Sequence, residues 1–207
     1  MSSGFLELCS DCSFWVQAFS LITGIVYMVM QVTQHRWMWY FGIFTAAAAL
    51  VVALSNCTEA GEWAPLWAQV MLNSYFLAMD IVGIFKWRKI ESRTGDVLHI
   101  VPMPKNRVLA YALIALVGGP VLCLLFSLTN DPAPVAEGIS FCLSIIAQIM
   151  LTRSHLEQWF VWMAADLVCI IIYAEQGAWW MVGLYYAYLL NSCIGVYYWR
   201  RHGTYVR

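Results

Sequence analysis

Charged side chains are scarce in this sequence. Asp, Glu, Lys and Arg make up only 11% of the 207 residues, whereas 62% are hydrophobic. A soluble domain carries about 25% charged residues, so this composition excludes an ordinary soluble fold. The sequence also lacks the alternating segments of about ten residues that mark a membrane β-barrel. Long apolar segments without this alternation indicate transmembrane helices, because a helix satisfies its own backbone hydrogen bonds.

Signatures of catalysis and metal binding are missing too. The sequence has no H-E-x-x-H, no G-x-S-x-G and no glycine-rich phosphate loop, so we expect no enzyme. Cys9 and Cys12 form a C-x-x-C without a second pair or clustered histidines, so we expect no metal and no cofactor. A disulfide among Cys9, Cys12 and Cys57 stays open. A membrane enzyme, and a structural or partner subunit without its own cavity, stay open as alternatives.

Seven apolar segments predict seven transmembrane helices. Short polar or Pro/Gly-bearing breaks separate them, and the only long loop is the polar stretch 86–107. The predicted spans are residues 14–33, 37–54, 63–85, 108–128, 135–151, 159–174 and 179–199. Seven tryptophans near the span ends predict an interfacial belt. They are Trp37, Trp39, Trp63, Trp87, Trp179, Trp180 and Trp199.

The basic residues orient this topology. All eleven fall on one side of a seven-span chain, and six or eight spans would scatter them over both sides. They are Arg36, Lys86, Arg88, Lys89, Arg93, Lys105, Arg107, Arg153, Arg200, Arg201 and Arg207. The positive-inside rule makes that side cytoplasmic. We therefore expect the N-terminus outside and the C-terminus in the cytoplasm.

The spans contain an internal repeat. Residues 40–88 and 158–200 each contain two spans and end on G-x-x-x-W-R, at Gly83 and Gly195. The seven spans therefore group as three, one and three, and the single linker helix makes the two triplets parallel. We expect a first bundle over residues 1–90, a loop and linker helix over 91–133, and a second bundle over 134–207. Transporters with parallel repeats bind substrate between the repeats, near the midplane.

Polar residues inside the spans mark the candidate site. Asp80 and Asp166 are costly in a membrane and therefore functional candidates. Trp159, Trp162 and Asp166 share one helix face at i, i+3 and i+7. A cavity lined by aromatic, amide and carboxylate groups suits a flat ring bearing an amide and hydroxyls, and tryptophan also attracts a cationic ring. The candidate substrate-binding residues are Gln69, Asn73, Phe76, Asp80, Gln148, Trp159, Trp162, Asp166, Tyr188 and Asn191.

Several motifs resemble one transporter family. They are L-S-I-I-A-Q-I-M-L-T-R over residues 143–153, E-Q-W-x-x-W-x-x-x-D over 157–166 and Y-x-x-Q-G over 173–177, together with Y-F-G at 40–42 and G-x-x-x-W at 83–87. This pattern resembles the PnuC family of bacterial nicotinamide riboside (vitamin B3) transporters, over nearly the whole chain. The family itself is similar to the SWEET sugar transporters, with two parallel three-helix bundles joined by one helix.

The resemblance implies a function in NAD biosynthesis. It implies facilitated diffusion of nicotinamide riboside across the bacterial inner membrane, with trapping by a cytoplasmic kinase. The family motif usually reads W-x-x-x-N where this chain has Trp162 and Asp166, so a related vitamin such as thiamine remains an alternative substrate. The lipid bilayer is the expected surrounding and nucleic acid is not an expected partner. Whether the chain forms a homo-oligomer stays open.

Overall fold

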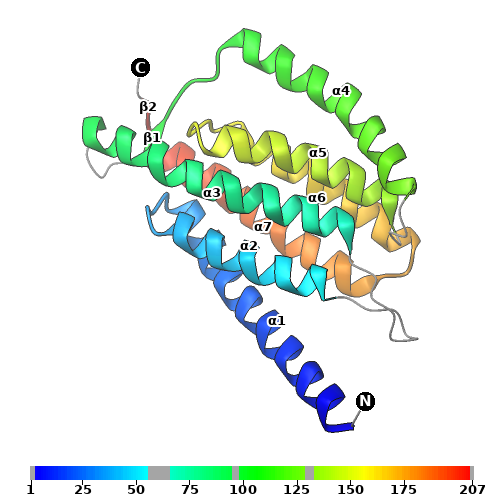
Figure 1. Ribbon diagram of the computed structural model, residues 1–207. Helices are drawn as coiled ribbons and strands as arrows, with labels where there is room; N and C mark the ends of the chain where they lie inside the picture. Colours follow the sequence, from blue (N-terminus) through cyan, green and yellow to red (C-terminus); the bar gives the residue numbers. More distant parts are fainter. Residues whose placement is uncertain (1–2, 56–65, 95–97, 129–132, 206–207) are drawn as a thin grey trace.

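A computed structural model describes residues 3–55, 66–94, 98–128 and 133–205. These residues form seven helices and one pair of two-residue strands (Figure 1). The helices are α1 (Ser3–Val32), α2 (Met38–Leu54), α3 (Trp67–Thr94), α4 (Lys105–Ser127), α5 (Pro134–Leu151), α6 (Gln158–Glu175) and α7 (Trp179–His202). The predicted all-α membrane fold of seven helices is confirmed. Cys57 and the side chains of Cys9 and Cys12 lie outside the described part.

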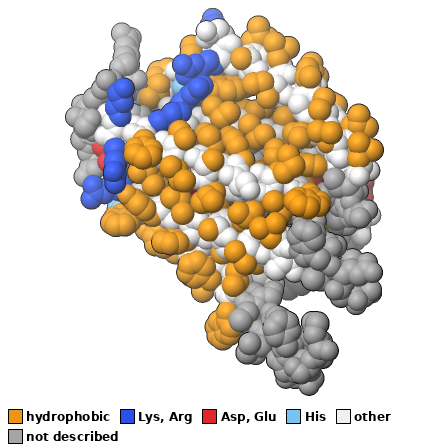
Figure 2. Space-filling model, in the orientation of Figure 1, with side chains coloured by type: hydrophobic (Ala, Val, Ile, Leu, Met, Phe, Trp, Pro, Cys, Tyr) orange, Lys and Arg blue, Asp and Glu red, His pale blue; other side chains and the backbone are white. Residues whose placement is uncertain are grey.

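Five helices are long and apolar enough to cross a membrane: α1, α3, α4, α5 and α6. α2 is equally apolar but has only 17 residues. α7 has 24 residues, but its tyrosines, Asn191 and Ser192 lower its hydropathy. The surface is correspondingly apolar, and lysines and arginines gather at one end of it (Figure 2).

The predicted long loop 86–107 is wrong in its extent. α3 continues to Thr94, because the lysines, arginines and glutamate that follow the apolar stretch are good helix formers. α4 begins at Lys105. Between these helices, β1 (His99–Ile100) pairs in parallel with β2 (Thr204–Tyr205), which follows α7. The sequence analysis did not anticipate this strand pair.

Helices that follow one another in sequence pack together, apart from α3 and α4. α2 lies between α1 and α3, α6 lies between α5 and α7, and α4 packs along α5 (Figure 1). The smaller contacts of α3 with α5 and of α1 with α7 connect the two groups. α4 leaves Leu109, Leu116 and Val117 more than 60% exposed, as expected for a helix whose outer face meets lipid.

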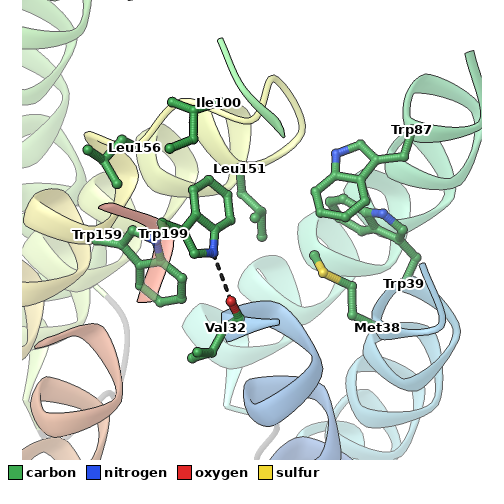
Figure 3. Packing of buried hydrophobic residues seen from close by; sticks show 9 residues of the cluster. All are labelled: Val32, Met38, Trp39, Trp87, Ile100, Leu151, Leu156, Trp159 and Trp199. Atoms are coloured by element: carbon green, nitrogen blue, oxygen red, sulfur yellow. Dashed lines mark hydrogen bonds between the residues drawn. The ribbon is translucent and has the colours of Figure 1, made fainter. Parts of the chain in front are cut away.

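Two tryptophan pairs form the core at one end of the helices (Figure 3). Trp39 meets Trp87 edge to face at 5.1 Å, and Trp159 meets Trp199 in the same way at 5.6 Å. All four side chains are at most 2% exposed. The interfacial belt is therefore wrong for Trp39, Trp87 and Trp199, although Trp37 and Trp179 are exposed as expected.

The G-x-x-x-W endings explain this burial. A Cβ atom at Gly83 would collide with the ring of Trp39, and a Cβ atom at Gly195 would collide with the ring of Trp159. Each glycine thus lets the tryptophan of the preceding helix lie directly on its backbone. The tryptophan one turn further along then closes over that ring. The repeated sequence motif is therefore a repeated packing joint between α2 and α3 and between α6 and α7.

Candidate functional site

Asp80 of α3 and Gln148 of α5 meet in the interior. Both side chains are 2% exposed, and Gln148 Nε2 donates a hydrogen bond of 3.0 Å to Asp80 Oδ1. Tyr27 of α1 faces the same pair. Gly42 of α2 lies against the Asp80 carboxylate, where any side chain would collide with it. Four helices therefore enclose this carboxylate, and it holds the amide of Gln148 in one orientation.

The surroundings of Asp166 in α6 are different. Its carboxylate is 4% exposed, and Ser192 of α7 is its hydrogen-bonding neighbour. Oδ2 is buried without a hydrogen-bond partner. Tyr188, one turn before Ser192, faces the same carboxylate. A buried carboxylate oxygen without a partner costs free energy, so this oxygen is available to a ligand.

Aromatic rings lie one turn away along α6. The Trp162 ring lies 6.4 Å from that of Phe76 on α3, and Trp162 Nε1 is also buried without a partner. Trp159 shares this helix face, but its ring lies fully buried in the tryptophan core. Trp162 therefore presents both a ring and a free donor one turn from Asp166. Trp159 belongs to the hydrophobic cluster against which Trp162 packs.

Gln69 and Asn73 have protein partners nearer the other end of α3. Gln69 Nε2 donates to both carboxylate oxygens of Glu137, at 3.0 and 2.9 Å, and thereby connects α3 to α5. Tyr173 of α6 donates to the same carboxylate at 3.3 Å. Asn73 Nδ2 donates to the Gln69 carbonyl of its own helix. The partly buried Asn191 lies on α7, three residues from Tyr188.

The structure thus joins the candidates in pairs rather than in one cluster. Asp80 joins Gln148, Phe76 joins Trp162, and Asp166 joins Tyr188. Tyr27 and Glu137 were missed by the sequence analysis. Tyr27 is one aromatic residue within an apolar span and carries no signal of its own. Glu137 had a signal, since it is an acidic residue in the first turn of α5.

An apolar hollow of about 410 Å³ lies elsewhere, between α1 and α2. Its lining includes Trp15, Phe19 and Phe44 and contains only apolar side chains. It offers no partner to a polar ligand, so we place no site there. The polar residues described above, by contrast, can form hydrogen bonds with a polar ligand.

Comparisons with known proteins agree with these observations. Residues 14–201 match the family described as "Nicotinamide mononucleotide transporter". The "Nicotinamide riboside transporter PnuC" of Haemophilus influenzae is 24% identical over 189 residues, which cover 90% of this chain and 80% of the relative. The protein of the same name from Escherichia coli K12 is 21% identical over 192 residues, covering 81% and 77%.

A solved structure shares the fold. It is described as "Crystal structure of the Vitamin B3 transporter PnuC" and is 20% identical to this chain, with a TM-score of 0.67. The match covers 95% of this chain and 87% of the other. These relatives are named as transporters and not as enzymes, which excludes the membrane enzyme left open above.

Proposed function

The chain belongs to the nicotinamide mononucleotide transporter family, and on that premise we propose that it carries nicotinamide riboside across the membrane. The relatives from three bacteria are named for this riboside. The observation that carries the proposal is that Trp162 Nε1 and Asp166 Oδ2, one turn apart on α6, are both buried without a partner. Gln158 and Trp159, at the start of the same helix, also have unpartnered buried atoms, but the Trp159 ring lies in the tryptophan core. Unsatisfied groups in a membrane-embedded helix are costly, so a ligand that pairs with them is stabilised.

Charge favours the riboside over its phosphorylated form. Nicotinamide riboside carries a pyridinium cation, which the Asp166 carboxylate and the face of Trp162 both attract. A mononucleotide adds a phosphate with about two negative charges, which Asp166 repels. The eleven lysines and arginines that could neutralise a phosphate follow the ends of spans and not their centres. Thiamine is also a cation, so it remains the second candidate.

The remaining candidates would hold the amide and the ribose hydroxyls. Asp80 fixes the Gln148 amide, which then offers its carbonyl oxygen in a defined direction. Phe76 faces Trp162 and would close the aromatic site from α3. Tyr188 lies beside Asp166 and can donate to the ribose. The wall of the proposed site is completed by the remaining candidates, Gln69, Asn73, Trp159 and Asn191.

Movement of two bundles would expose this site to each side in turn. We interpret residues 1–90 and 134–207 as parallel three-helix bundles joined by α4, which the packing order and the repeated tryptophan joints support. Rocking of one bundle against the other is the general mode of such repeats. We assign passive facilitated diffusion, with uptake sustained because phosphorylation in the cytoplasm removes the substrate.

The distribution of basic residues supports the orientation. Arg88 of α3 donates to Tyr40 of α2, and Arg107 of α4 lies against His155 after α5, so these helix ends meet at one end of the molecule. By the positive-inside rule this end faces the cytoplasm of a bacterial inner membrane. The N-terminus then lies outside and the C-terminus inside.

Binding calorimetry on the purified protein tests the substrate. We expect binding of nicotinamide riboside that Trp162→Ala and Asp166→Ala each weaken at least tenfold, about 1.4 kcal/mol. The matched controls are Trp179→Ala and Glu175→Ala, because both side chains are exposed. Tight binding of thiamine without binding of the riboside would overturn the assignment. Wild-type affinity in both site variants would overturn the placement of the site.

Proteoliposomes test the passive mechanism. We expect the internal riboside concentration to rise only to the external one, with or without an imposed proton or sodium gradient. Including a riboside kinase and ATP inside the vesicles should convert this equilibration into continued uptake. Accumulation against a concentration gradient without the kinase would contradict facilitated diffusion.

A further inference from the structure

A short segment between α3 and α4 is held by hydrogen bonds from several parts of the chain. We call residues 98–101 the strap. Gln34, in the turn between α1 and α2, clamps its backbone: Nε2 donates to the His99 carbonyl at 2.9 Å, and Oε1 accepts from the His99 N–H at 2.8 Å. The amide of Gln34 thus pairs with the strap as a neighbouring strand would. This clamp joins the strap to the first three helices.

The turn between α5 and α6 holds the strap from the other group of helices. The Val101 N–H donates to the Ser154 carbonyl at 3.0 Å, and Ser154 Oγ lies 2.9 Å from His99 Nε2. His155 Nδ1 donates to the Val101 carbonyl at 2.8 Å. His99, Ser154 and His155 are at most 4% exposed, so these bonds are shielded from water.

The two turns are equivalent positions of the internal repeat. Gln34 has φ 54° and Ser154 has φ 55°, the only positive values among the described non-glycine residues. His35 N–H donates to the Met30 carbonyl in the first turn, and His155 N–H donates to the Met150 carbonyl in the second. The left-handed backbone is unfavourable for both residue types. The strap therefore binds the same strained point of each repeat.

The strap also covers the tryptophan core. Ile100 is 1% exposed and belongs to the cluster that contains both tryptophan pairs (Figure 3). Thr204 N–H, after α7, donates to the Leu98 carbonyl at 2.8 Å. Beneath the strap, Trp199 Nε1 of α7 donates to the Val32 carbonyl at the end of α1, at 3.0 Å. The two groups of helices are thus closed against each other at this end.

We propose that the strap is a latch that keeps the substrate path closed at the end bearing the basic residues, and that Gln34 and Ser154 are its gating residues. This inference rests on the proposed rocking of two bundles. The bundles can part at this end only if the strap releases one of the two turns. Release would break the bonds of Val101 and His99 to Ser154 and His155, and would expose Ile100. The strap then closes again when the substrate has left.

A reversible crosslink tests whether the latch must open. In the double variant His99→Cys/Ser154→Cys, a short bifunctional thiosulfonate would join the strap to the second turn. We expect at least a tenfold loss of riboside uptake, recovered on reduction, while riboside binding persists. The matched control is Tyr40→Cys/Arg88→Cys, which joins α2 to α3 within the first group, where the native side chains are hydrogen-bonded. Its crosslink should leave uptake unchanged.

Hydrogen exchange tests the clamp without relying on transport. Gln34→Ala removes both side-chain bonds to His99, so we expect exchange at the strap amides to rise at least tenfold. Thr33→Ala is the control, because that hydroxyl bonds only to carbonyls of its own helix. Unchanged exchange in Gln34→Ala, or full uptake with the His99–Ser154 crosslink in place, would overturn the latch. Absence of riboside uptake by the unmodified protein would instead overturn the proposed function and leave the exchange result standing.

Discussion

The two halves of the molecule share a packing joint but differ in the hydrogen bonding of their buried carboxylate. In each half a tryptophan lies on a glycine of the next helix, Trp39 on Gly83 and Trp159 on Gly195. In the first half, Asp80 receives the amide of Gln148. In the second half, Asp166 keeps one oxygen without a partner. The shared joint is therefore structural, whereas the unmatched carboxylate is the reason we propose that the second half binds the ligand.

The shared joint can be broken by adding volume at its glycines. Gly195→Leu would force a side chain into the Trp159 ring, and overpacking of this kind costs about 1–3 kcal/mol or more. We expect the Tm of the protein in detergent to fall by about 2–12 °C, since 1 kcal/mol shifts Tm by about 2–4 °C at this size. Gly83→Leu should do the same through Trp39.

Gly183→Leu is the matched control on the same helix, α7. A Cβ atom at Gly183 meets nothing within 4 Å, so the larger side chain should leave the Tm within about 1 °C. If Gly83→Leu and Gly195→Leu behaved like Gly183→Leu, the repeated motif would not be a packing joint.

Isosteric substitutions test whether the two buried carboxylates differ in their effect on substrate binding. Asp166→Asn removes only the charge, so the pyridinium loses its counter-charge, and we expect calorimetry to show at least a tenfold loss of riboside affinity, about 1.4 kcal/mol. Asp80→Asn keeps an acceptor for the Gln148 amide, so we expect less than a threefold loss. Equal losses in the two variants would show that both carboxylates act on the substrate directly.

The charge argument has its own control ligand. Nicotinamide mononucleotide should bind more weakly than the riboside to the unmodified protein, because its phosphate faces Asp166. Asp166→Asn should reduce this difference in affinity. It removes the repulsion of the phosphate together with the attraction of the pyridinium. A difference that did not change would place the phosphate away from α6.

The fold was largely predictable from local sequence, because long apolar segments suffice to place membrane helices. α2, α5 and α6 begin and end within a residue of the expected spans. The burial of Trp39 and Trp199 was not predictable from their positions near span ends. It depends on glycines in neighbouring helices, and no single segment reveals that pairing.

The partners of the candidate site residues could not be predicted, for the same physical reason. Acidic and amide residues in apolar spans are conspicuous, and Asp80, Gln148 and Asp166 were chosen as candidates in this way. Which oxygen is satisfied depends on a partner from another helix, as Gln148 is for Asp80. The strap was missed because its contacts join turns more than fifty residues from His99. Its residues carry no pattern of their own.

The smallest expected effect is a pH dependence that distinguishes the two equivalent turns. His35 is exposed, whereas His155 is fully buried, and this burial lowers the pKa of His155. The Val101 carbonyl can only accept a hydrogen bond, so the proton sits on Nδ1, and Nε2 faces Arg107 at 3.5 Å. The other titratable or charged groups around this ring are Glu157, Arg153 and, through Ser154, His99.

The lowered pKa fixes the sign of the pH effect on the strap. The closed strap favours neutral His155, so its stability is complete above about pH 6.5 and is lost as the pH falls through the lower pKa of the closed state. We expect strap amides, corrected for intrinsic exchange, to open about threefold more often at pH 5.5 than at pH 7.5. His155→Gln should remove this dependence and His35→Gln should retain it. If His35→Gln removed it instead, the first turn and not the second would carry the pH sensitivity of the latch.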